Sequence, residues 1–218
     1  MIDYSLIQKV VINLHRRPDR LQKFKDNCPL NDVEVVYGFD GKHPEKEIPE
    51  EYELFSKNLN KLRPGEIGCF ISHLRIYQMI LEKNYPYALI MEDDAIFCPD
   101  FHTKFLNVIG ETPNDTDILY IGGRFVSNFY MKNCIEISNT VVKHNASSSG
   151  HDADRTTHAY IISNNAARFL LDKFNEDGHI KCPVDHWMIH SFLVNSLPIY
   201  NAQPLLCHSP ASRDSDIR

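Results

Sequence analysis

The chain has 218 residues, of which 43% are hydrophobic and 24% are charged, and its formal net charge is −6 at pH 7. These proportions are typical of a globular protein, and the length suits one sizeable domain. The basic residues cluster only briefly, at Arg16, Arg17 and Arg20, so no stripe is long enough to neutralise a nucleic-acid backbone. We therefore expect one globular domain over residues 1–218 and no nucleic-acid partner.

The N-terminal segment and the hydropathy of the chain give no reason to expect export or membrane insertion. Its N-terminal segment, MIDYSLIQKVVINLHRRPDR, has no sustained apolar core, and no stretch approaches the roughly 18 apolar residues of a membrane helix. The six cysteines are dispersed and include no CxxC pair, so we expect reduced thiols and no disulfide. We expect a soluble, cytoplasmic protein without a transmembrane segment, and its oligomeric state is left open.

Short β-rich segments alternate with helical ones along the chain. We expect strands at residues 10–14, 33–37, 87–91, 118–121, 158–163 and 197–200. We expect helices at residues 17–27, 65–83, 164–175 and 184–194, the third with Ser163 as its N-cap. This alternation predicts an α/β fold with a mostly parallel central sheet and helices on both faces.

Two segments interrupt the alternation. Residues 44–64 and 128–155 are expected to be long surface loops, which makes them candidates for acceptor recognition or for a lid. The polar residues 209–218 are expected to form a frayed tail.

The helix expected at residues 65–83 carries a stripe of small residues beside its apolar stripe. Gly65, Gly68, Cys69 and Ser72 recur at helical spacing and would let the start of the helix approach a strand or a ligand closely. Its N-terminus is a candidate anion site, because free N–H groups and the helix dipole favour phosphate there. Tight packing of helix against sheet is the alternative, and spacing alone favours it.

The strongest local signal is YALIMEDDAIF, an apolar strand that ends in Glu92, Asp93 and Asp94. Three adjacent carboxylates repel one another, and a hard divalent cation that also binds a diphosphate would offset the repulsion. In open α/β sheets the ligand crevice lies beyond the carboxyl ends of the strands, where these residues fall. The alternative is a solvated acidic turn.

Two further segments are candidates for contacts to a nucleotide. INLHRRPDR places Arg16 and Arg20 at the start of a helix, where guanidinium groups bind phosphate in bidentate fashion. GFDGK follows the next strand and would place Asp40 beside a nucleotide. A salt-bridged helix start and an ordinary Asp-Gly turn are the alternatives.

Two single residues are candidates for chemistry. His208 follows the apolar run PLLC and would supply a nitrogen ligand to the metal. Asp185, in CPVDHW, has apolar neighbours, and a partly desolvated carboxylate is a usable general base. A carboxylate that stabilises the start of a helix is the alternative for Asp185. For His73, on the small-residue stripe, a hydrogen-bonded core position is the default.

Taken in order, several motifs resemble glycosyltransferase family 25, which contains bacterial lipooligosaccharide galactosyltransferases and the catalytic domains of collagen hydroxylysine galactosyltransferases. The motifs are INLHRRPDR, GFDGK, LRPGEIGCFISH, ALIMEDD, DILYIGGR, THAYIISNNAARFLL, CPVDHW and QPLLCH. Several are weak individually, but their number and order are specific.

The resemblance implies a GT-A fold and inverting transfer of a hexose from a UDP-sugar to a glycan or glycoprotein acceptor. Galactose is the first choice, with glucose and N-acetylglucosamine as alternatives, and Mn²⁺ is the expected cofactor, with Mg²⁺ as the alternative. Glu92, Asp93 and Asp94 match the family's acidic motif for metal and donor. Residues in segments expected near the donor are Asn13, Arg16, Arg20, Asp40, Gly65, Ser72 and His73.

The resulting scheme gives Asp94 the metal, with help from Glu92 or Asp93 and from His208. Asp185 and Asp93 are the candidate catalytic residues; Asp185 is the first choice for general base, and Asp152 and Asp154 are its rivals. A metal-dependent phosphohydrolase or nucleotidyltransferase is one alternative function, and a non-catalytic nucleotide-sugar-binding module is another.

Overall fold

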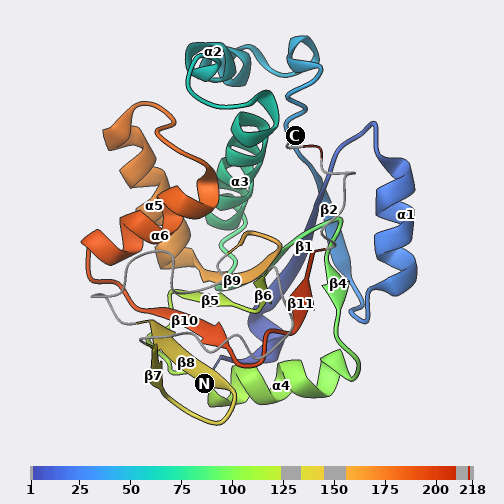
Figure 1. Ribbon diagram of the computed structural model, residues 1–218, viewed down its shortest axis with the longest axis vertical. Coiled ribbons are helices and arrows are strands. Elements are labelled where there is room, and N and C mark those ends of the chain that lie inside the picture. The colour runs from blue at the N-terminus through green and yellow to red at the C-terminus, as the bar shows by residue number, and fades with distance from the viewer. Residues whose placement is uncertain (1, 124–133, 145–155, 210–215, 217–218) are drawn as a thin grey trace.

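The computed structural model describes residues 2–123, 134–144, 156–209 and 216. Its centre is an eight-stranded sheet in the order β2-β1-β3-β9-β5-β10-β8-β7 (Figure 1). The strands are β1 (Ile7–Asn13), β2 (Val33–Tyr37), β3 (Tyr87–Glu92), β5 (Ile118–Tyr120), β7 (Cys134–Glu136), β8 (Val141–His144), β9 (Ala159–Ser163) and β10 (Ile199–Ala202). Only β8 and β9 run against the direction of the other strands of this sheet, so the predicted mostly parallel α/β architecture is confirmed.

A second, three-stranded sheet has the order β4-β11-β6. It consists of β4 (Ile96–Phe97), β6 (Gly122–Gly123) and β11 (Cys207–His208). In this sheet His208 pairs with Ile96 on one side and with Gly123 on the other.

Helices cover both faces of the main sheet (Figure 1). One face carries α1 (Pro18–Asn27) and α4 (Phe101–Glu111), and the other carries α2 (Pro49–Asn58), α3 (Pro64–Glu82), α5 (Asn164–Asp177) and α6 (Val184–Val194). Short 3₁₀ turns occur at Tyr4–Leu6 and Pro44–Lys46. Within the described part of the chain, each helix is too short or too polar to cross a membrane. All six cysteines are described, and none forms a disulfide.

Strand β3 shows how the sheet separates two cores. Ala88 and Ile90 pack in the core under α3, α5 and α6, whereas Leu89 and Met91 pack in the core under α1 and α4. Because side chains alternate along a strand, Glu92 continues the series of Ala88 and Ile90 and faces α3. The strand period thus determines which face of the sheet the first of the three acidic residues reaches.

The expected helices and strands are all present, with ends shifted by a few residues, and Ser163 caps α5 by accepting a 3.0 Å hydrogen bond from the N–H of Ala166. The prediction that residues 44–64 form a loop is wrong, because α2 lies within them. Phe55 of α2 is only 3% exposed and stacks on Phe39 with ring centroids 5.2 Å apart. Glu51 accepts a hydrogen bond from Arg75 of α3. These tertiary contacts stabilise α2 although the polar, proline-rich composition of the segment favours a loop.

Two further differences concern regular structure that was not expected. Residues 128–155 are not all loop, since β7 and β8 form an antiparallel pair; the rest of this segment lies outside the described residues. Helix α4 was also missed. Its buried Phe101, Phe105 and Val108 have the three-and-four spacing of an apolar helix face, which would have predicted it.

Candidate functional site

The candidate site lies at the carboxyl ends of three adjacent parallel strands. Asn13 ends β1, Glu92 ends β3, and the segment around Asp40 follows β2. Ten of the twelve site residues expected from the sequence line one pocket there: Asn13, Arg16, Arg20, Asp40, Gly65, Ser72, His73, Glu92, Asp93 and Asp94. Lys42, Cys69 and Asp216 line it as well. Asp185 and His208 are not among the lining residues.

The small-residue stripe brings the start of α3 against the segment that follows β2. A Cβ atom on Gly68 would lie 2.8 Å from the carbonyl oxygen of Phe39, and one on Gly41 would lie 2.2 Å from that of Pro64. The hydroxyl of Ser72 accepts a 2.8 Å hydrogen bond from the N–H of Phe39 and donates one of 2.6 Å to Gly68. Gly68 and Ser72 therefore serve close helix packing, the alternative that the spacing favoured.

One side of the pocket is a cationic cluster that holds a carboxylate. Oδ1 of Asp216 lies 2.7 Å from Nη2 of Arg16, and its Oδ2 lies 2.7 Å from Nη1 of Arg17. Arg20 and Lys42 approach the same carboxylate at 3.3 and 3.5 Å. Burial opposes ionisation of Asp216, but Arg16 and Arg17 outweigh it and hold its pKa below the usual value. Four basic side chains thus converge on the single carboxylate of Asp216.

Asp93 connects this cationic cluster to the acidic residues. It forms an ion pair with Arg20 and accepts a 2.6 Å hydrogen bond from Nδ2 of Asn13. Burial nevertheless raises the pKa of Asp93 to about 6. Burial and the charge of Glu92 raise the pKa of Asp94, whose Oδ1 atom is buried without a hydrogen-bond partner among the described residues. An added cation would give this oxygen a partner.

Among the described residues, two groups bring potential metal-ligand atoms within 4.8 Å of one another. The first consists of Glu92, Asp94 and His158. Burial opposes ionisation of Glu92, but neighbouring groups, His158 first among them, outweigh it and lower the pKa of Glu92 to about 2. Two carboxylates and an imidazole suit Mn²⁺. His208 is in neither group, and its role as a ligand stays a prediction.

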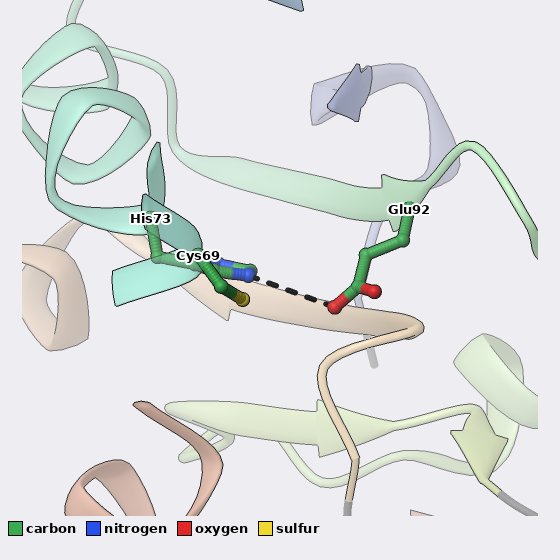
Figure 2. A group of neighbouring side chains, drawn as sticks. All are labelled: Cys69, His73 and Glu92. Atoms are coloured by element: carbon green, nitrogen blue, oxygen red, sulfur yellow. Dashed lines mark ion pairs between the residues drawn. The ribbon is translucent and has the colours of Figure 1, made fainter. Parts of the chain in front are cut away.

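The second group consists of Cys69, His73 and Glu92, and it shares Glu92 with the first. Figure 2 shows Cys69 and His73 projecting from one helix toward the carboxylate of Glu92. Nε2 of His73 lies 3.9 Å from Oε1 of Glu92, which also accepts a 2.5 Å hydrogen bond from the hydroxyl of Thr157. Burial, with the charges of Glu92 and Asp185, raises the pKa of the Cys69 thiol well above its usual value.

Asp185 lies in the first turn of α6 and accepts a 2.8 Å hydrogen bond from the N–H of His186. Asp185 does not line the pocket, but its negative charge is one of the causes that raise the pKa of the Cys69 thiol. Its rivals as general base, Asp152 and Asp154, lie outside the described residues. The assignment of the base stays a prediction.

Comparison with known proteins identifies the family. Residues 6–188 match glycosyltransferase family 25, which is described as an LPS biosynthesis protein family. The chain belongs to glycosyltransferase family 25. The resemblance inferred from the motifs is thereby confirmed.

Several animal proteins are relatives of this family 25 chain. It is 26% identical to procollagen galactosyltransferase 1 of Danio rerio, over 91% of the chain and 35% of the relative. It is 28% identical to a glycosyltransferase 25 family member of Anopheles gambiae, over 94% of the chain and 37% of the relative. For procollagen galactosyltransferase 2 of Homo sapiens the identity is 25%, over 91% and 34%. The chain thus spans about a third of the length of these relatives.

Sequence reasoning missed several residues of the candidate site. His158 immediately precedes β9 within the motif THAYIIS, yet only its strand was predicted. Cys69 was assigned only to the small-residue stripe. Asp216 was placed in a tail expected to fray. The arginine cluster called for an acidic partner, and Asp216 is that partner although it lies far from the arginines in sequence.

Proposed function

We propose that the chain transfers a hexose from a UDP-sugar to a hydroxyl of a glycan or glycoprotein acceptor, with inversion at the anomeric carbon and with a divalent cation. One observation carries the proposal. The pocket holds the anion-binding cluster of Arg16, Arg20 and Lys42 directly beside the acidic pair Glu92 and Asp94. A cation-bound diphosphate requires positive groups and carboxylates on adjacent sides of one site.

In this proposal Glu92, Asp94 and His158 would hold Mn²⁺, with Mg²⁺ as the alternative. The fit rests on their ligand set and on the unpartnered, buried Oδ1 atom of Asp94. When bound, the ion would supply positive charge against the diphosphate as it leaves.

The chain's own residues would bind and orient the donor. Arg16, Arg20 and Lys42 would bind the diphosphate in place of the Asp216 carboxylate. Asp93 would keep the guanidinium of Arg20 oriented through their ion pair. Oδ2 of Asp40 forms an ion pair with Nε of Arg16 at 2.8 Å, and Asp40 would lie near the nucleoside.

The transfer itself is a single displacement. The acceptor oxygen forms a bond to the anomeric carbon while the bond from that carbon to the UDP oxygen breaks on the opposite face. The acceptor proton passes to a carboxylate, for which Asp185 is the first choice, and UDP leaves with the bonding electrons. Galactose is the favoured sugar because relatives of the chain are named galactosyltransferases.

A donor screen tests the proposal. Purified protein is incubated with UDP-galactose, UDP-glucose or UDP-N-acetylglucosamine, with Mn²⁺ or EDTA, and with glycan or hydroxylysine-peptide acceptors, and released UDP is measured. We expect acceptor-dependent release, fastest from UDP-galactose and only with the cation. Binding of UDP-sugars without release under any of these conditions would instead support a non-catalytic module.

A further inference from the structure

The second group of potential ligands, Cys69, His73 and Glu92, is built from two elements that face each other. Cys69 and His73 are four residues apart on α3 and therefore lie on one face of the helix. Glu92 ends β3 on the side of the sheet that faces α3, as its alternation with Met91 requires. The ligand atoms of the three side chains lie within 4.8 Å of one another (Figure 2).

His73 is the best-positioned member of this group. It is completely buried, and its Nδ1 atom shares a 2.7 Å hydrogen bond with the hydroxyl of Tyr160. Its Nε2 atom, which points toward Glu92, is buried and has no hydrogen-bond partner among the described residues. A histidine that binds a metal through one ring nitrogen almost always donates a hydrogen bond through the other.

The bonds beyond His73 favour a lone pair on Nε2. The hydroxyl of Tyr160 lies 2.9 Å from that of Tyr77, which in turn donates to Sδ of Met188 at 3.0 Å. If His73 donates from Nδ1 to Tyr160, and Tyr160 donates to Tyr77, every hydrogen in the series has an acceptor. The opposite direction would put a buried hydrogen on Nε2 with no acceptor in bonding distance, which is costly.

We propose that Sγ of Cys69, Nε2 of His73 and the carboxylate of Glu92 form a binding site for Zn²⁺. Sulfur, imidazole and carboxylate are the ligand types of zinc sites, and a thiolate selects against Mn²⁺ and Mg²⁺. The hydroxyl of Thr157 holds Oε1 of Glu92, as Tyr160 holds His73. All three ligand residues line the pocket, from which water or a substrate atom could supply a fourth ligand.

A zinc ion at this site would affect the proposed cation-dependent binding of the donor, and this consequence rests on the proposed function. Glu92 belongs to both groups, so Zn²⁺ and the donor's cation would compete for one carboxylate. Zn²⁺ should therefore weaken Mn²⁺-dependent donor binding. Zinc binding itself does not depend on catalysis and can be tested separately.

The test is Zn²⁺ binding to tag-free, metal-stripped protein, measured by competition with a chromophoric chelator, together with Co²⁺ substitution. We expect one Zn²⁺ per chain and a thiolate-to-cobalt charge-transfer absorption band. Cys69→Ser should abolish that band. It should also weaken zinc binding by more than about 10-fold, because losing even a group that only supports a metal ligand typically costs about 10-fold in affinity. Tyr160→Phe should weaken binding by about 10-fold.

Cys98→Ser is the matched control, because Cys98 is a partly buried thiol that belongs to neither ligand group. It should leave both signals unchanged. Three results would overturn the proposal: no zinc binding by the wild type, a cobalt complex without the thiolate band, or zinc binding that survives Cys69→Ser and is lost in Asp94→Asn. The last result would place the ion at the group of Glu92, Asp94 and His158. A donor that still binds with Mn²⁺ in Cys69→Ser would leave the proposed function intact.

Discussion

Asp216 and Arg16 form an ion pair in which Oδ1 of the carboxylate lies 2.7 Å from Nη2 of the guanidinium, across nearly the whole length of the chain. The carboxylate is only 15% exposed and lines the pocket proposed for the donor. A side chain near the C-terminus thus occupies the cationic part of the site, where a phosphate of the donor would bind.

Asp216→Asn should tighten UDP binding in the presence of Mn²⁺ by about 3- to 10-fold. The variant removes an anion that competes for Arg16, Arg17 and Arg20, and a part-exposed ion pair is worth roughly 1 kcal/mol. Calorimetric titration with UDP measures the effect. Asp19→Asn is the control, because Asp19 pairs with Arg17 but does not line the pocket. Weaker UDP binding by Asp216→Asn would mean that Asp216 helps to build the donor site instead of blocking it.

Asp94 and Asp185 should separate donor binding from chemistry. Asp94→Asn should lose most cation-dependent UDP binding, since it removes a hard anionic ligand. Asp185→Asn should keep its affinity for UDP and lose transfer by a factor of about 10² or more, the usual contribution of a positioned base.

Asp172→Asn, at an exposed position on α5, is the control for both variants and should change neither property. Wild-type transfer by Asp185→Asn would refute the assignment of the base and direct attention to Asp152 and Asp154. Loss of UDP binding in that variant would assign Asp185 to the donor site.

Gly68→Ala should perturb the site through the backbone. Its new methyl group would lie 2.8 Å from the carbonyl oxygen of Phe39, so α3 must move away from the segment that carries Asp40. We expect a loss of about 1–3 kcal/mol in the free energy of unfolding, together with weaker UDP binding. Gly110→Ala is the matched control, because its added Cβ would meet no atom within 4 Å apart from its chain neighbours and the backbone of its own helix. Alanine in that helix should be neutral or slightly stabilising. Equal effects of the two variants on urea unfolding would refute the close-packing argument.

Asp177 should make stability depend on acid pH. Its carboxylate is 7% exposed and accepts hydrogen bonds from Lys181 at 2.7 Å and from Nε1 of Trp187 at 3.1 Å. Burial alone would raise its pKa, but Lys181, Trp187 and Lys173 outweigh burial and lower it from 3.8 to about 2. Because the folded-state pKa is depressed, the stabilisation is complete above the ordinary pKa and disappears as pH falls toward about 2.

The free energy of unfolding of Asp177→Asn should therefore be about 1–2 kcal/mol lower than that of the wild type at pH 7. This difference should shrink as pH falls below about 4. Urea unfolding followed by the fluorescence of Trp187, the single tryptophan, measures this difference. Glu176→Gln is the control, since Glu176 is 70% exposed and pairs only with Lys173 among the described residues. A deficit that stays constant between pH 7 and pH 3 would show that ionisation of Asp177 is not the cause.

From the sequence alone, the part of the candidate site in which acidic side chains follow an apolar strand could be located. Glu92 could be located because an apolar strand ends there, whereas Asn13 was expected near the donor only from the family resemblance. Gly65, Ser72 and His73 of α3 were likewise expected near the donor from the resemblance, because the spacing alone favoured close helix packing. These signals are local, and each needs only a few consecutive residues.

Contacts between distant segments could not be predicted in the same way. Asp216 meets the arginines only because the chain returns to the site, and no local pattern encodes that return. His158 reaches Glu92 because β9 pairs with β3, a pairing that the strand pattern does not specify. Helix α2 was missed because the burial of Phe55 depends on Phe39, outside its own segment.

The most direct test of a cation-dependent UDP-sugar site is calorimetric binding of UDP-galactose in Mn²⁺ and in EDTA, with the wild-type protein and no acceptor. The carboxylates of Glu92 and Asp94 repel a diphosphate unless a cation lies between them, whereas Arg16 and Arg20 still attract it. We expect binding in Mn²⁺ and much weaker, though measurable, binding in EDTA. Equal affinity under the two conditions would contradict the account.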